Sequence, residues 1–237
     1  MDFLNALILL LNYIFVPALA YGSQLAIGAI FVTLIYGILR FANFATGDMM
    51  SFGTMVAILF TWYFQSLGLS LGFLPTALLA IPFAILFMGL YMLIIDKFVF
   101  KYYRLNKSPP VQLAMVSIGV MFVTQAVVRI IIGPSDRRFF DGEKFLIRAN
   151  EFKEMTGLNE GLAIKSTQVI TIVVTIILVS TLFWFLNKTK TGKSMRAYSD
   201  NEDLALLSGI DPKKIVMITW MIAAILATVG GVLYGLD

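Results

Sequence analysis

The sequence predicts an all-α, polytopic transmembrane helical bundle, and three observations carry that prediction. Of the 237 residues, 59% are hydrophobic and only 14% are charged, whereas soluble domains are about half apolar and about one quarter charged. The mean hydropathy is +0.87, which a soluble domain could reach only by exposing large apolar patches to water. The apolar residues also gather into runs of about 20, the length that crosses a bilayer core of about 30 Å as a helix.

About seven apolar runs have the length of membrane spans, and polar connections separate them. The first run differs from a signal peptide because its only early charge is Asp2 and another apolar run follows within a few residues, so we interpret it as a retained span. Residues 1–237 then form a single transmembrane domain. The predicted spans are Leu4–Ala20, Gln24–Phe41, Met49–Phe64, Leu74–Ile95, Val111–Ile132, Gln168–Leu186 and Ile215–Leu236.

Basic residues indicate how these spans are oriented, because short cytoplasmic loops are enriched in Lys and Arg. Eleven basic residues fall in the short connections on one side, mainly within residues 97–107 and 188–214. The long connection on the other side, residues 133–167, carries six basic residues that six acidic residues balance. We therefore expect residues 133–167 to be external, and both residues 188–214 and the N-terminus to be cytoplasmic.

The residues that the chain lacks exclude several kinds of chemistry. There is no Cys and no His, which removes thiolate ligands, cysteine nucleophiles and the commonest general base and metal ligand. We therefore predict no catalytic residue, no metal site and no cofactor, so the chain is not expected to be an enzyme. Gly192-Lys193-Ser194 matches the end of a phosphate-binding loop, but that pattern requires Gly where Asn187 stands. The basic residues lie in loops between spans, which also argues against nucleic acid as a partner.

The connection between the second and third spans is polar although it is only a few residues long. Asn43, Thr46, Gly47 and Asp48 lie there, and the chain has little room to leave the membrane. Irregular polar backbone at membrane depth is tolerated only where protein buries it or where it lines a water-filled path. The alternatives are a tight turn at the interface and a part of the translocation path, for which these four residues are the candidates.

The last span carries a stripe of small residues. Ala223, Ala227, Gly231 and Gly235 are spaced four apart, and such a stripe lets two helices in lipid approach closely. Packing within this chain is the simpler interpretation, and a subunit interface or a pore lining is the alternative.

The cytoplasmic connection, residues 188–214, contains one short predicted helix. Ser199 and Glu202 match a capping box, Gly209 suits the position just after the helix, and Asp211-Pro212 suits the start of the next helix. A helix of about two turns is not stable alone in water, so it is either a fraying connector or a helix held by a partner surface. The candidate contact residues are Ser199, Asp200, Asn201, Glu202, Asp203, Leu204, Leu207 and Gly209.

The segments 22–48, 191–197 and 200–211, with the stripe that follows, resemble the permease subunit of bacterial branched-chain amino-acid ABC importers, the LivH type. The resemblance covers essentially the whole chain. It implies a multi-pass protein of the bacterial inner membrane that pairs with a second permease subunit, two cytoplasmic ATPase subunits and an external substrate-binding protein. The short cytoplasmic helix is then similar to a coupling helix, which docks in a groove of the ATPase. Alternating access would pass a small-molecule substrate, a branched-chain or similar amino acid, into the cytoplasm.

The chain departs from that family in two places. The resemblance leads us to expect His where Thr46 stands, whereas Asp48 fits the acidic position. Members of the family continue through further spans beyond the position of Asp237, so we expect this chain to be a C-terminally truncated fragment.

Two rival functions remain open at the level of the sequence. One is a related ABC permease for urea, amides or sugars. The other is an ion-coupled secondary transporter, which needs no ATPase; the scarcity of acidic residues within the spans and the exposed cytoplasmic helix argue against it.

Overall fold

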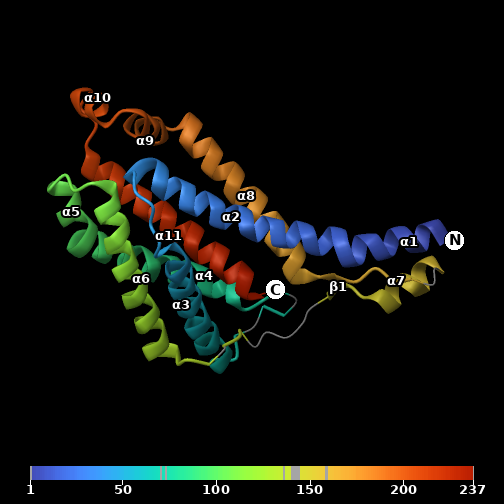
Figure 1. The fold of residues 1–237 in the computed structure, drawn as a ribbon. Coiled ribbons are helices and arrows are strands. Elements are labelled where there is room, and N and C mark those ends of the chain that lie inside the picture. The colour runs from blue at the N-terminus through green and yellow to red at the C-terminus, as the bar shows by residue number, and fades with distance from the viewer. Residues whose placement is uncertain are drawn as a thin grey trace.

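Helices make up most of the computed structural model, which describes residues 2–69, 71–72, 74–135, 137–139, 145–157 and 160–236 (Figure 1). The prediction of an all-α fold is confirmed, and the strands β1 (Phe145–Ile147) and β2 (Ile164–Lys165) form only a short antiparallel pair. Two π-helical turns, η1 and η2, lie within longer helices. In chain order the helices are α1 (Asp2–Leu10), η1 (Leu11–Phe15), α2 (Val16–Leu39), α3 (Thr46–Ser66), α4 (Ala77–Ile95), η2 (Asp96–Phe100), α5 (Lys101–Leu105), α6 (Pro110–Ile132), α7 (Ala149–Thr156), α8 (Ser166–Lys188), α9 (Lys190–Asp200), α10 (Glu202–Leu207) and α11 (Pro212–Leu236).

The first two predicted spans, Leu4–Ala20 and Gln24–Phe41, are one continuous helix of 37 residues, Phe3–Leu39. Residues 21–23 interrupt the apolar pattern but not the helix, because a single Gly costs a helix only about 1 kcal/mol relative to Ala. Pro17 has no N–H to donate, and the π-helical turn η1 ends two residues before it. Among the described residues, five helices are long and apolar enough to cross a membrane, so the count of about seven spans is not confirmed.

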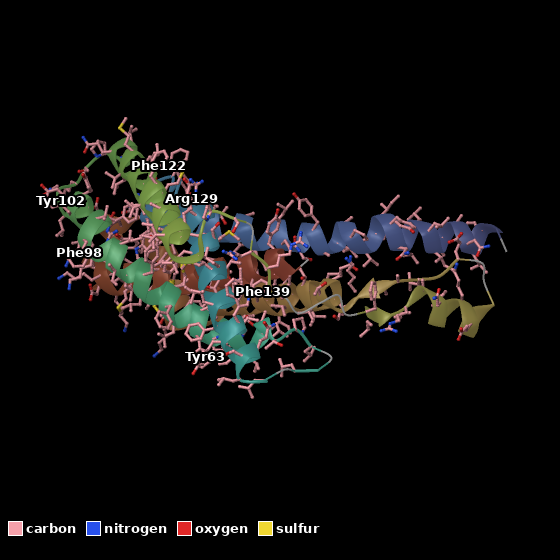
Figure 2. All side chains as sticks on the ribbon, turned by 90° about the horizontal axis from the view of Figure 1, so that it is seen from below. Tyr63, Phe98, Tyr102, Phe122, Arg129 and Phe139 are labelled. Carbon is pink, nitrogen blue, oxygen red and sulfur yellow. The ribbon has the colours of Figure 1, made fainter. Side chains whose placement is uncertain are left out.

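The other five predicted spans lie on α3, α4, α6, α8 and α11, with ends within a few residues of those expected. Helix α3 is not among the five membrane-competent helices, because polar residues occur at both of its ends. Much of the outer surface of the bundle is apolar. Tyr63, Phe98, Tyr102 and Phe122 project away from it (Figure 2), and each is more than half exposed.

Helix α1 lies at the same end of the molecule as β1 and α7 (Figure 1). The backbone N–H of Ala163 donates a hydrogen bond of 3.2 Å to the Asn12 side-chain oxygen, while α9 and α10 lie at the opposite end (Figure 1). At about 1.5 Å per residue, the helix Phe3–Leu39 is about 55 Å long. A single crossing by this helix therefore puts α1 on the same side of the membrane as β1, α7 and β2.

Helix α11 is the most enclosed of the long helices. Of the residues in its most apolar stretch, 72% are buried, compared with 11% for α8. It packs against α2, α3 and α4, and its small residues permit the close approach. A Cβ added to Gly231 would lie 2.8 Å from the Met50 carbonyl oxygen, and one added to Gly230 would lie 2.9 Å from Ile27 Cγ2. Ala223 and Ala227 are fully buried, so this face of α11 packs within the chain.

The tight α3–α11 contact predicts that Gly231→Leu destabilises the fold. A side chain there must displace Met50 and Thr54, and overpacking of this kind should lower the free energy of unfolding by about 3 kcal/mol. Thermal melting of the purified chain in detergent measures the effect. Gly119→Leu is the matched control, because nothing lies within 4 Å of a Cβ at that exposed position. Equal melting of the two variants would contradict the packing described here.

Candidate functional site

Arg40 is the residue at which the chain leaves α2. It adopts the left-handed conformation (φ 58°, ψ 30°), which costs a residue with a Cβ about 1–2 kcal/mol. Its backbone N–H donates to the Tyr36 carbonyl at 3.0 Å. Its guanidinium donates to the carbonyl oxygens of Ser199 and Asp200 at 2.8 and 3.2 Å. These hydrogen bonds offset the cost of the turn and connect the end of α2 to the end of α9.

The segment between α2 and α3 is held inside the bundle by hydrogen bonds. The Phe44 backbone N–H donates to Ser117 Oγ at 3.0 Å, and the Ala45 backbone N–H donates to Asn43 Oδ1 at 3.1 Å. Asn43 is only 7% exposed. Ser117 lies seven residues into α6, about 10 Å along its axis from Pro110. Protein groups at some depth in the bundle therefore satisfy the backbone N–H of Phe44 and of Ala45 in this irregular segment.

Two open cavities lie near this segment, one lined partly by it and one that begins just after it. One, of about 490 Å³, lies against α2 and is lined by Thr33, Tyr36, Asn43 and Thr46, among others. The other, of about 590 Å³, begins at Gly47 and continues along α3 toward the residues that follow α6. Its walls include Met50, Ser51, Thr54, Gly231, Gly235 and Arg137.

Three of the four candidate path residues thus line these cavities. Asn43 and Thr46 line the first cavity and Gly47 lines the second, whereas Asp48 lines neither. Thr46 Oγ1 donates to the Asn43 carbonyl at 3.1 Å. Gly47 is exposed, and nothing lies within 4 Å of a Cβ added there.

Residues 188–214 contain two helices rather than the one that was predicted. Helix α9, which the sequence analysis missed, begins after Thr189, whose hydroxyl accepts the Gly192 N–H at 3.0 Å. It buries Met195 and Tyr198. The signal was present, because Thr is a common N-cap and the spacing of three residues puts Met195 and Tyr198 on one helix face.

The cap of α10 also differs from the predicted capping box. Asn201, not Ser199, is the N-cap, and its side-chain oxygen accepts the Leu204 N–H at 3.1 Å. Ser199 is still in α9, and its hydroxyl donates to the Gly37 carbonyl at 2.7 Å. The Glu202 carboxylate accepts from the Tyr198 hydroxyl at 2.7 Å instead of reaching back to the backbone. Burial and the Glu202 carboxylate raise the pKa of the Tyr198 phenol far above its usual range, so the phenol remains a donor.

Helix α10 exposes two of its leucines, although the helix itself is held in place. Leu204 is 61% exposed and Leu207 is 85% exposed, whereas Ala205 is buried. Gly209 has a φ of +80°, and the hydrogen bond from the Ile210 N–H to the Ala205 carbonyl closes the helix end. A helix of six residues that cannot stand alone in water is therefore held by its neighbours, with its apolar side chains facing outward.

The described residues thus combine exposed leucines on α10 with two open cavities beside α2 and α3. No group of three or more metal-ligating side chains occurs among the residues that the structure describes.

Comparisons with known proteins agree on one family. The family described as "Branched-chain amino acid transport system / permease component" matches residues 14–237. The high-affinity branched-chain amino acid transport system permease protein LivH of Escherichia coli (strain K12) is 27% identical over 218 residues, which cover 90% of this chain and 67% of that protein. The corresponding permease protein BraD of Pseudomonas aeruginosa is 26% identical, with 94% of this chain and 70% of that protein covered.

A probable branched-chain amino acid transport permease protein LivH of Methanocaldococcus jannaschii is 27% identical over 223 residues, which cover 63% of its length. The chain therefore spans about two thirds of the length of the relatives that it matches. No solved structure matches the chain significantly.

Proposed function

Because the chain belongs to the family of permease components of branched-chain amino acid transport systems, we propose that it forms half of the membrane path of an ATP-driven importer. The substrate is a branched-chain or similar amino acid that moves into the cytoplasm. The partners are a second permease subunit, two cytoplasmic ATPase subunits and an external substrate-binding protein, and the location is the bacterial inner membrane. The single observation that carries the proposal is that α10 exposes two leucines to its surroundings while hydrogen bonds hold both of its ends.

In this proposal α10 is the coupling helix. Leu204 and Leu207 enter an apolar groove of an ATPase subunit, and the acidic residues of the first turn of α10, Glu202 and Asp203, lie at the rim of the contact. Apolar anchors with a polar rim are the common anatomy of protein interfaces. A helix too short to fold alone is well suited to such a role, because a partner supplies the surface that it lacks.

Movement of α10 has two routes into the membrane part of the chain. The loop after Gly209 leads directly into α11, whose first residue is Pro212, and Asp211 Oδ1 accepts the Lys213 N–H at 2.9 Å. On the other side, Arg40 donates to the carbonyl oxygens at the end of α9. Displacement of α10 would therefore act on the central helix and on the segment beside Asn43 together, which provides a basis for alternating access.

We place the translocation path of the proposal along these two cavities. Thr33, Tyr36, Asn43 and Thr46 supply hydrogen-bonding groups on one side, and Ser51 and Thr54 supply them on the other. A second permease subunit packed against them would turn the two open cavities into one enclosed path. The preference for branched-chain cargo rests on the family.

The orientation is the remaining part of the proposal. We place residues 188–214 in the cytoplasm and residues 133–167 outside, as the distribution of basic residues favours. With one crossing by the helix Phe3–Leu39, the N-terminus is then external instead of cytoplasmic. The hydrogen bond between Asn12 and Ala163 supports this assignment.

The orientation can be tested by cysteine labelling, because the chain has no Cys of its own. In intact spheroplasts, Phe3→Cys and Glu154→Cys should react with an impermeant thiol reagent, and Leu207→Cys should react only after the membrane is opened. If Phe3→Cys alone were protected, residues 3–39 would instead form two spans with a reversal between them.

The coupling role predicts that Leu204→Asp weakens binding of the ATPase subunits at least tenfold, because it buries an unpaired charge at a cost of several kcal/mol. Co-purification of the complex and substrate-stimulated ATPase activity both measure the effect, and the two should fall together. Ser194→Asp on α9 adds the same charge outside the proposed contact and should leave both unchanged. Normal assembly and activity of Leu204→Asp would remove the coupling role from α10.

The path predicts that Gly47→Trp reduces uptake about tenfold or more in the assembled importer, because the indole would fill the cavity that begins at that residue. Folding should be unaffected, since nothing lies within 4 Å of a Cβ there. Gly119→Trp introduces the same bulk at an equally open position outside both cavities and should transport normally. Normal uptake by Gly47→Trp would show that the substrate passes elsewhere.

A further inference from the structure

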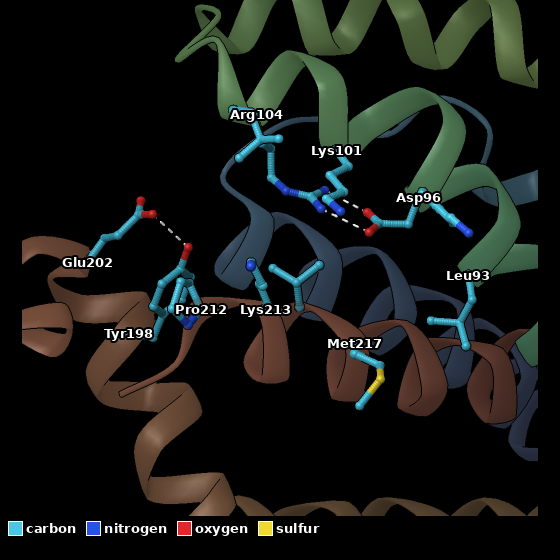
Figure 3. A pocket seen from close by; sticks show the side chains of 12 residues that line it. Leu93, Asp96, Lys101, Arg104, Tyr198, Glu202, Pro212, Lys213 and Met217 are labelled. Carbon is cyan, nitrogen blue, oxygen red and sulfur yellow. Dashed lines mark hydrogen bonds and ion pairs between the residues drawn. The ribbon is translucent and has the colours of Figure 1, made fainter. Parts of the chain in front are cut away.

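A third cavity, of about 360 Å³, lies at the α9–α10 end of the bundle (Figure 3). The end of α4 with η2 and α5 forms one wall, the start of α11 forms another, and residues from α9 and α10 complete it. Its apolar lining includes Leu93, Val216 and Met217. Its polar lining comprises four basic and two acidic side chains together with the Tyr198 hydroxyl: Asp96, Lys97, Lys101, Arg104, Tyr198, Glu202 and Lys213.

Both acidic side chains of this cavity already have partners. Asp96 accepts two hydrogen bonds from the Arg104 guanidinium, at 2.6 and 2.9 Å, and a third from the Trp220 indole N–H at 2.7 Å. Glu202 accepts from Tyr198 (Figure 3). The paired Asp96 and Arg104 cancel in charge, which leaves three lysines against one carboxylate.

The three lysines are not paired with acids in the part of the chain that the structure describes. Arg104–Asp96 is the one ion pair found there. The Lys97 Nζ atom lies over the ring of Phe98, 5.6 Å from the ring centroid. Lys97 and Lys101 stand one helical turn apart on the wall opposite Lys213. The N-terminal end of the 25-residue helix α11 lies at the same place and adds positive potential. The cavity therefore attracts an anion.

The surroundings of the cavity indicate what kind of anion it holds. Ile94, Phe98 and Tyr102 each follow a lining residue directly in the chain, and they are between 45% and 73% exposed. A phospholipid would place its phosphate between the lysines and its acyl chains on these apolar side chains. Basic pockets between membrane helices on the cytoplasmic side commonly bind anionic headgroups.

We propose that this cavity binds the phosphate of an anionic phospholipid from the cytoplasmic leaflet, between Lys97 and Lys101 on one wall and Lys213 on the other. The choice of leaflet rests on the orientation given under the proposed function. A bound headgroup would connect the α5 wall to the start of α11 beside Glu202. It would thus brace the junction through which α10 joins the bundle.

The test is native mass spectrometry of the purified chain in detergent, titrated with phosphatidylglycerol and, separately, with phosphatidylcholine of the same acyl chains. The triple variant K97Q/K101Q/K213Q should lose about tenfold or more in affinity for phosphatidylglycerol, because each lysine contributes to attraction of the anionic headgroup. Its weak binding of phosphatidylcholine should not change. The matched control K188Q/K190Q/K193Q removes three exposed lysines at the α9–α10 end of the bundle and should bind phosphatidylglycerol like the parent.

Three results would overturn the proposal. Equal losses in the two triple variants would mean diffuse attraction without a site. Competition by glycerol phosphate at concentrations similar to those of the lipid would identify a soluble phosphate as the ligand. Undiminished lipid binding by K97Q/K101Q/K213Q, together with loss of ATPase co-purification, would assign the cavity to the ATPase contact. Since lipid binding is read without ATPase or transport, failure here leaves the proposed function standing, and the reverse also holds.

Discussion

Hydrogen bonding of backbone away from water is the constraint on which the rest of this structure depends. Helices satisfy it within themselves, but residues 40–45 do not form a helix, so their polar groups need partners elsewhere. Ser117 on α6 and the side chain of Asn43 supply two of them. The cost of the left-handed turn at Arg40 is offset by its bonds to α9. The segment is therefore fixed between the bundle core and the α9–α10 end.

The same constraint explains why the two proposed working parts are close in space although they are about 160 residues apart in sequence. Arg40 begins the segment that leads to Asn43 and Thr46, and it also donates to Ser199 and Asp200. Helix α11 makes a second connection, because it starts three residues after Gly209 and runs through the centre of the bundle. Its small-residue face allows α2 and α3 to approach closely, so a tilt of α11 would be passed to both neighbours.

The membrane-spanning elements were predictable because they follow from apolar run length, which is a local property. Five predicted spans match helices with ends within a few residues. The continuity of residues 3–39 was not predictable in the same way, since a Tyr-Gly-Ser step lowers local hydropathy without breaking the helical hydrogen bonds. The prediction failed at residues 21–23, where the lower hydropathy was interpreted as a loop between two spans.

The site was predictable only in part. The composition of residues 199–209 indicated a short capped helix, and α10 is present with Gly209 at its end. Asn201 rather than Ser199 caps α10, because the Ser199 hydroxyl donates its hydrogen bond to the Gly37 carbonyl, 162 residues away. Asp96 bonds to Arg104 and to Trp220 of α11, and its place in the sequence does not indicate the second partner. Such long-range partners leave no pattern in a single sequence.

Uptake into proteoliposomes that contain the complete importer tests the central claim, ATP-driven inward transport through this subunit, most directly. Radiolabelled leucine should accumulate only with ATP on the side of α10 and the substrate-binding protein on the opposite side. Collapse of the proton and sodium gradients with ionophores should leave the rate unchanged. Accumulation that persists without ATP and stops when those gradients are collapsed would contradict the account, because it would identify an ion-coupled transporter.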